Sequence, residues 1–172
     1  MGSGRPNGVN ATAAALLGLL HDGPMTGGQL VAAAVARFGA FFTVTRSQVY
    51  RELPALAEAG LLELGEQGPR ASQQFVITPA GRKAFMQWLA EGGGVEGLRS
   101  PLVLRLLHAE ALTPDQRVEL VDGARAVVVG RLSEARARAR AEKDPYRKAV
   151  ADFTVAHTRA MVKLLDAIPT KD

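Results

Sequence analysis

The spacing of apolar residues over the first sixty positions predicts three short helices. Each follows a residue that can accept a hydrogen bond from the first helical turn: Asn10, Thr26 and Thr45. Both threonines are followed three residues later by glutamine, which is the spacing of a capping box. The predicted helices cover residues 11–21, 27–38 and 46–59. We expect their inward residues to be Leu16, Leu17, Leu19 and Leu20, then Leu30, Val31, Ala34, Val35 and Phe38, then Val49, Leu53 and Leu56.

Two short segments rich in branched and aromatic residues follow, at 61–66 and 73–78. The turn-rich stretch 67–72 separates them, and this order predicts a β-hairpin with a flexible tip. Thr78 and Pro79 then begin a fourth helix, which ends at the glycine run 92–94. Three helices, a hairpin and a fourth helix are the order of a winged helix-turn-helix domain, whose third helix enters the DNA major groove.

The rest of the chain is predicted to be helical, with helices over residues 101–111, 114–142 and 145–168. The last helix carries a heptad-like apolar seam, and the long helix before it carries a second stripe. Two long amphipathic helices with narrow seams usually need a partner, so we expect a dimerisation arm. The seam residues are Tyr146, Val150, Phe153, His157, Met161, Leu164 and Ile168 on the last helix, and Val118, Val121, Val128, Leu132 and Ala135 on the long one.

The predicted fold class is therefore mainly α with a small β-hairpin wing: a winged helix-turn-helix followed by a helical dimerisation domain. We expect a disordered tail over residues 1–9, the winged helix over 10–91, a linker over 92–99 and the helical domain over 100–172. Gly92 to Gly97 match the pattern G-x-G-x-x-G, but a helix precedes them where a dinucleotide site needs a strand, so this stretch is interpreted as a linker.

The ordered set of motifs resembles the PadR family of bacterial winged-helix transcription regulators, in the subfamily with the larger helical C-terminal domain. The resemblance is carried by ALLGLLHDGPMTGGQL, QVYRELPALAEAGLLE, FVITPAGRKAF, SPLVLRLLHAEALTPDQRVELV and PYRKAVADFTVAHTRAMVKLLDAI. It implies a homodimer that binds double-stranded DNA, and a response to small aromatic or drug-like molecules. The family's second helix usually opens with His-Gly-Tyr, where this chain has Thr26, Gly27 and Gly28, so a DNA contact from that tyrosine is absent. Proline, which often directly follows the tyrosine of the third helix in the family, comes here at Pro54, where it is expected to bend the helix.

Composition narrows the function further. The 172 residues have a net charge of +4 and a sequence pI near 9.8, which suits a polyanionic partner. Cysteine is absent and the three histidines are far apart, so we expect no metal, no cofactor and no catalytic constellation, and therefore no enzyme. No apolar run is long enough to span a membrane and the N-terminus lacks a signal-peptide core, so we expect a cytoplasmic protein.

Candidate DNA contacts lie at the start of the third helix and in the wing. Arginine can pair with guanine or phosphate, glutamine with adenine, and hydroxyl groups with phosphates. The alternative is an ordinary solvated helix face and a solvated loop. The candidates are Thr45, Arg46, Ser47, Gln48, Tyr50 and Arg51 on the helix, with Arg70, Ser72 and Gln73 in the wing.

Two further sets of candidates concern dimerisation and regulation. Val150, Phe153, His157, Met161 and Leu164 are the expected dimer interface, in which His157 is either an ordinary interface residue or a ligand or pH sensor. A small aromatic effector would be walled by Trp88, Leu89, His108 and Phe153, although plain core packing of Trp88 is the alternative.

The leading hypothesis is thus a homodimeric transcriptional regulator, specifically a repressor of a pseudo-palindromic operator that an aromatic effector releases. The alternative is a winged-helix module that binds proteins or small molecules without reading DNA.

Overall fold

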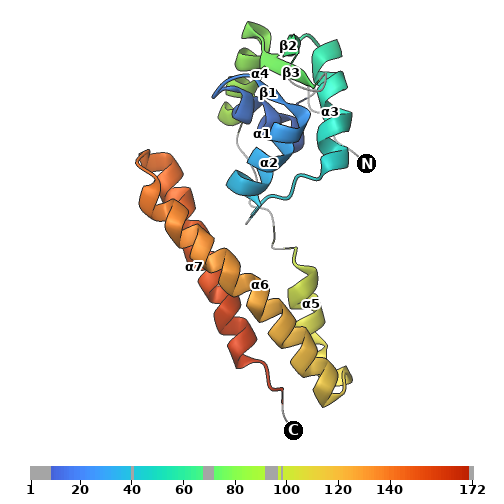
Figure 1. Ribbon diagram of the computed structural model, residues 1–172, viewed down its shortest axis with the longest axis vertical. Coiled ribbons are helices and arrows are strands. Elements are labelled where there is room, and N and C mark those ends of the chain that lie inside the picture. The colour runs from blue at the N-terminus through green and yellow to red at the C-terminus, as the bar shows by residue number, and fades with distance from the viewer. Residues whose placement is uncertain (1–8, 40, 68–71, 92–96, 98, 171–172) are drawn as a thin grey trace. The chain divides into compact units, whose positions relative to one another are not determined.

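The computed structural model describes residues 9–39, 41–67, 72–91, 97 and 99–170. These residues fall into two compact units, Met1–Val95 and Glu96–Asp172, which are described one after the other (Figure 1). Most of the predicted tail and linker lies outside the described residues. Val9, placed in the tail by the sequence, is instead 3% exposed and packs in the core of the first unit. It directly precedes the N-cap Asn10, a position from which an apolar side chain often packs back on the first helical turn.

The first unit has the element order of a winged helix, and the predicted fold class is confirmed. Each of its four helices begins at the predicted capping residue, and both predicted capping boxes form. Gly60 ends the third helix with a φ of 71°, a backbone conformation that favours glycine. The elements are α1 (Ala11–Leu20), β1 (Met25–Thr26), α2 (Gly27–Phe38), α3 (Arg46–Glu58), β2 (Leu62–Gln67), β3 (Gln73–Ile77) and α4 (Pro79–Ala90).

The wing is part of a three-stranded antiparallel sheet in the order β1-β3-β2. The hairpin β2–β3 was predicted from the sequence, and in the structure Leu62 lies opposite Ile77. Strand β1 was not, because it is only two residues long and its pairing of Met25 with Phe75 joins segments fifty residues apart. This short strand ties the start of α2 to the wing.

The core of the first unit forms around α1, which contacts α2, α3 and α4 (Figure 1). Leu16, Leu17, Leu19 and Leu20 are all at most 1% exposed, as predicted. Val35, which was expected to face inward, does not: it is 62% exposed. On α2 the inner face is narrow, because only Leu30, Ala34 and the first-turn Gly27 are buried.

The second unit is an antiparallel helical hairpin preceded by a short helix (Figure 1). Its elements are α5 (Pro101–Leu107), the 3₁₀ turn η2 (Ala109–Ala111), α6 (Pro114–Ala141) and α7 (Pro145–Ala167). The helix predicted over residues 101–111 is therefore divided at His108. Leu106, Val121, Val128 and Leu165 form the core between the helices.

A hydrogen bond 2.7 Å long, from Arg125 Nε to Asp166 Oδ1, links α6 to α7. This bond raises the pKa of Arg125 above its usual value.

Candidate nucleic-acid interface

The N-terminal half of α3 packs against the core through apolar residues on one side and is exposed to solvent on the other. Val49 and Leu53 are at most 1% exposed, and Val44 just before the helix is 5% exposed. With the inner face fixed in this way, the helical period turns the intervening side chains outward. Arg46, Ser47, Tyr50 and Arg51 are accordingly all exposed.

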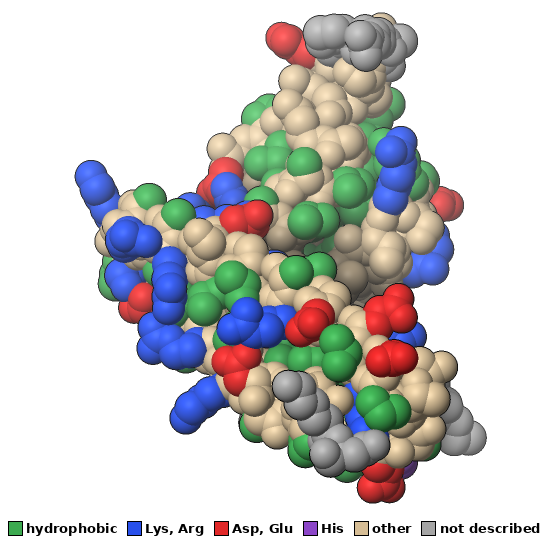
Figure 2. Space-filling model, turned by 60° about the horizontal axis from the view of Figure 1, so that its bottom comes forward, with side chains coloured by type: hydrophobic (Ala, Val, Ile, Leu, Met, Phe, Trp, Pro, Cys, Tyr) green, Lys and Arg blue, Asp and Glu red, His purple; other side chains and the backbone are tan. Residues whose placement is uncertain are grey.

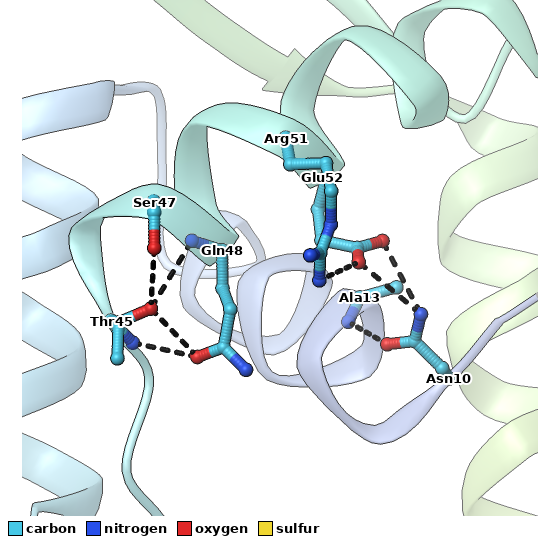
Figure 3. A network of polar contacts seen from close by, with 7 residues as sticks. All are labelled: Asn10, Ala13, Thr45, Ser47, Gln48, Arg51 and Glu52. Atoms are coloured by element: carbon cyan, nitrogen blue, oxygen red, sulfur yellow. Dashed lines mark hydrogen bonds and ion pairs between the residues drawn. The ribbon is translucent and has the colours of Figure 1, made fainter.

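The first turn of α3 is held by a local hydrogen-bond network (Figure 3). The Gln48 backbone N–H donates to Thr45 Oγ1 at 3.2 Å, and Gln48 Oε1 accepts from the Thr45 backbone N–H at 2.8 Å and from its hydroxyl at 3.0 Å. Ser47 Oγ lies 3.1 Å from the same hydroxyl. Reading adenine with glutamine requires both its amide oxygen and its amide nitrogen. Gln48 would therefore have to leave the cap to make that contact, and its function in this structure is to start the helix.

A second network connects the recognition helix to the start of α1 (Figure 3). The Asn10 amide nitrogen donates to both carboxylate oxygens of Glu52, at 3.4 and 3.3 Å, while Asn10 Oδ1 caps α1 by accepting from the Ala13 backbone N–H. Arg51 lies 3.5 Å from the same carboxylate, and its own side chain is 71% exposed. Sequence reasoning identified Asn10 only as a cap. Its link to Glu52 spans 42 positions, and no local pattern indicates it.

Arg46 lies over an aromatic ring rather than beside a carboxylate. Its guanidinium carbon is 5.3 Å from the centroid of the Tyr50 ring, one helical turn further along α3. A cation over a ring face is attracted by the ring quadrupole without losing its charge. Arg46 is thus a positioned and unneutralised cation on the exposed face.

The wing candidates separate into three cases. Arg70 lies outside the described residues. Ser72 is described and half-buried. The side-chain amide of Gln73 donates to the carbonyl groups of Gly65 and Gln74, at 2.9 and 3.0 Å, so it ties the hairpin together from within.

In the second unit, α7 has two apolar faces. Thr158 and Leu165 face the core of the hairpin and are at most 6% exposed. The first part of the predicted seam lies elsewhere on the helix and is open: Tyr146, Val150 and Phe153 are 84%, 46% and 55% exposed. Hydrophobic side chains also reach the surface among Lys and Arg side chains in the space-filling view (Figure 2).

The remaining candidates for the dimer interface are half-buried. The ring of His157 stacks on that of Phe153, with centroids 5.9 Å apart. Met161 and Leu164 pack in part against the core of their own hairpin. The exposed apolar surface of α7 is therefore concentrated in its N-terminal half.

The four effector candidates belong to different units. Trp88 is half-buried against the core of the first unit, and its indole nitrogen is buried without a hydrogen-bond partner among the described residues. Leu89 is exposed. In the second unit Phe153 is exposed, and His108 lines a shallow groove of ≈ 580 Å³ together with Arg105, Leu112, Gln116, Glu119 and Leu120.

Other kinds of site are not found in the part of the chain that the structure describes. No group of three or more His, Asp or Glu side chains there could hold a metal ion. None of the described helices is long and apolar enough to cross a membrane.

An exposed, basic N-terminal half of a third helix, followed by a β-hairpin wing, defines a DNA-binding winged helix-turn-helix domain. Residues 16–87 match the model of the Transcriptional regulator PadR-like family. The resemblance predicted from the sequence is thus confirmed over residues 16–87, which match a family of transcriptional regulators and not of enzymes.

Solved structures show the same fold. A PadR-like transcriptional regulator from Bacillus cereus is 18% identical with a TM-score of 0.76, covering 90% of this chain and 93% of its own. PadR of Bacillus subtilis in complex with operator DNA is 20% identical with a TM-score of 0.70, covering 90% and 94%. The same PadR in complex with p-coumaric acid is 18% identical with a TM-score of 0.62, covering 93% and 96%. A comparison with curated protein sequences gave no match.

Proposed function

We propose that this protein represses transcription by binding a pseudo-palindromic operator as a homodimer. The observation that carries the proposal is the outer face of α3, where Arg46, Ser47, Tyr50 and Arg51 are exposed above the buried Val49 and Leu53. The operator complex of the Bacillus subtilis PadR, a protein of the same fold, supports the same use of the domain here.

Each exposed side chain has a chemical role in this proposal. Arg46 lies at the N-terminus of α3 and pairs with a guanine edge or a phosphate. The positive end of the α3 helix dipole also attracts the phosphate. Arg51 and the hydroxyl groups of Thr45, Ser47 and Tyr50 contact phosphates, which fix the register without reading sequence. Arg70, which lies between the two hairpin segments in the sequence, is a further candidate for contact with the minor groove or its phosphates.

The exposed seam of α7 supports the homodimer. Val150 and Phe153 would leave a large apolar surface in water on a monomer, and a second copy of the same helix would cover it. His157, Met161 and Leu164 would extend the interface along the helix. A two-fold dimer sets its recognition helices about 34 Å apart, or a multiple of that distance, so the operator would be an inverted repeat with the same spacing.

A small aromatic effector is the proposed regulator. The PadR of Bacillus subtilis has been solved with p-coumaric acid. In this chain the indole nitrogen of Trp88, which is buried without a hydrogen-bond partner among the described residues, supports a ligand with a hydrogen-bond acceptor. Binding that favours one dimer geometry over another would change the affinity for DNA and release the operator.

Selection of binding sites from a pool of random DNA duplexes tests the proposal. The parent protein is expected to enrich an inverted repeat whose half-sites are about one helical turn, or a multiple of it, apart. Enrichment of no sequence, together with tight binding of a small molecule, would favour a winged-helix module that does not read DNA.

A further inference from the structure

A glycine in the first turn of α2 makes room for a side chain of the recognition helix. Gly27 is buried, and a Cβ atom built on it would lie 3.0 Å from Cε1, 3.1 Å from Cζ and 3.2 Å from the hydroxyl oxygen of Tyr50. These distances are shorter than ordinary contacts between carbon atoms. The ring of Tyr50 therefore packs on the bare backbone of α2, in a space that any larger residue at position 27 would occupy.

The next residue provides a natural comparison. Gly28 is exposed, and a Cβ atom there would meet nothing within 4 Å. Both glycines lie in the first turn of the same helix, after the Thr26 cap, so their helical surroundings are nearly the same. Only Gly27 is needed for contact with α3.

The Tyr50 ring has a second function, because it carries Arg46. The guanidinium of Arg46 lies 5.3 Å from the ring centroid, and both side chains are exposed. A long arginine side chain on an exposed helix samples many rotamers, and a ring face beneath it restricts that sampling. Gly27, Tyr50 and Arg46 thus form a chain of contacts from the interior of the helix-turn-helix to its surface.

We propose that Gly27 is a positioning residue for DNA recognition, which acts through the Tyr50 ring on the guanidinium of Arg46. The inference deepens the proposed function and rests on it. A methyl group at position 27 displaces the ring, the displaced ring no longer supports Arg46, and the arginine must be ordered again when DNA binds. The cost falls on operator affinity and not on the fold, because the ring is half exposed and has space to move.

The test compares Gly27→Ala with Gly28→Ala, on an operator duplex obtained by selection with the parent protein. Both substitutions increase helix propensity to the same degree. Gly27→Ala is expected to weaken operator binding about fivefold, which is the scale of an exposed cation–π contact. Gly28→Ala is expected to bind within twofold of the parent. Equal affinity of the two variants would overturn the proposal.

A double-mutant cycle distinguishes positioning from a general structural effect. In a protein that already carries Arg46→Ala, Gly27→Ala is expected to cause a smaller loss of affinity than in the parent, because the guanidinium that it positions is gone and only the phosphate contact of the Tyr50 hydroxyl can still be disturbed. A further loss as large as in the parent background would show that Gly27 acts independently of Arg46, and would overturn the proposal.

Substitutions at Tyr50 test the contact between its ring and Arg46 without changing Gly27. Tyr50→Phe keeps the ring and is expected to leave the coupling between positions 27 and 46 intact, whereas Tyr50→Leu removes the ring face and is expected to abolish that coupling. This pair keeps the test valid even if Gly27→Ala lowers the melting temperature.

The outcomes separate this inference from the proposed function. If the parent selects no duplex, or Arg46→Ala and Arg51→Ala both bind like the parent, the assignment of α3 as the reading helix fails and this inference fails with it. If only Arg46→Ala binds like the parent, this inference alone fails. If Arg46→Ala weakens binding but Gly27→Ala does not, the function stands and the positioning role is wrong.

Discussion

Arg46 and Arg51 occupy the same exposed stretch of α3 in different electrostatic surroundings. Arg51 lies 3.5 Å from the carboxylate of Glu52, which offsets part of its charge and also accepts from Asn10. Arg46 has an aromatic ring beneath it, which leaves its charge intact. Of the two, Arg46 is expected to contribute more to the affinity for DNA.

Replacing each arginine by alanine tests this ranking. Arg46→Ala is expected to weaken operator binding by on the order of 1–3 kcal/mol, the loss typical of one good base or phosphate contact. Arg51→Ala is expected to cost less, because the Glu52 carboxylate already offsets part of the charge of Arg51. Fluorescence anisotropy with a labelled duplex measures both, with circular dichroism as the control for folding. Unchanged affinity in both variants would mean that α3 is not the reading helix.

Asn10 is predicted to stabilise the winged helix through two interactions, the cap of α1 and the hydrogen bonds to Glu52. Asn10→Ala removes the cap of α1 and the hydrogen bonds to Glu52, and the cap alone is worth about 1 kcal/mol. We expect the free energy of unfolding in urea to fall by at least that amount. Asn10→Ser, which retains a capping oxygen but not the reach to Glu52, is expected to lose less. Equal stability of the alanine variant and the parent would contradict this role.

At the scale of elements, local sequence signals predicted where the helices begin, whereas contacts between segments far apart in the sequence could not be predicted from it. The capping boxes of α2 and α3 could be predicted because all their atoms lie within four residues. Strand β1 pairs across fifty residues, and the tie from Asn10 to Glu52 crosses 42, so neither has a local pattern. The same limit holds for the site. Its exposed face on α3 was predictable from helical periodicity, whereas the packing of Tyr50 on Gly27 depends on how two helices meet.

One wrong prediction has a similar physical origin. Apolar spacing put Val35 on the inner face of α2, but only a narrow stripe of that helix meets the core, and Val35 lies beyond its edge. The bend expected at Pro54 stays a prediction. The helix α3 continues through Pro54 to Glu58, and Pro54 lies on its exposed side, where water can replace the missing hydrogen bond.

The exposed half of the α7 seam leads to a prediction about assembly. Phe153→Glu introduces a charge at a position that is 55% exposed in the single chain, so the helical hairpin is expected to fold normally. In a dimer the same charge would be buried against apolar groups, which is strongly unfavourable. Multi-angle light scattering at micromolar concentration is expected to give a dimer for the parent and a monomer for Phe153→Glu.

Two comparisons complete the dimer test. Arg159→Glu changes an exposed residue of α7 outside the seam and is expected to remain dimeric. Leu164→Glu is expected to weaken the dimer and also the hairpin, since Leu164 packs in part on its own core. A parent protein that runs as a monomer under these conditions would contradict the proposed interface.

At the scale of the whole molecule, the single tryptophan reports on regulation. The emission of Trp88 is expected to change saturably on titration with phenolic and planar aromatic compounds, and the same compounds are expected to lower the affinity for operator DNA. Saturable quenching with unchanged DNA affinity would separate binding from regulation and contradict the proposed release. No response to any compound would identify Trp88 as ordinary core packing.

The central claim is that the α3 face of this PadR-like domain binds a specific DNA sequence through its arginines. Titration of the selected operator and of a scrambled duplex, at two salt concentrations, with the parent and Arg46→Ala, tests it most directly. The parent is expected to prefer the operator, with an affinity that falls steeply with salt, and Arg46→Ala is expected either to lose the preference or to have a salt slope smaller by about one. Equal binding of both duplexes by both proteins, with the same salt dependence, would contradict it.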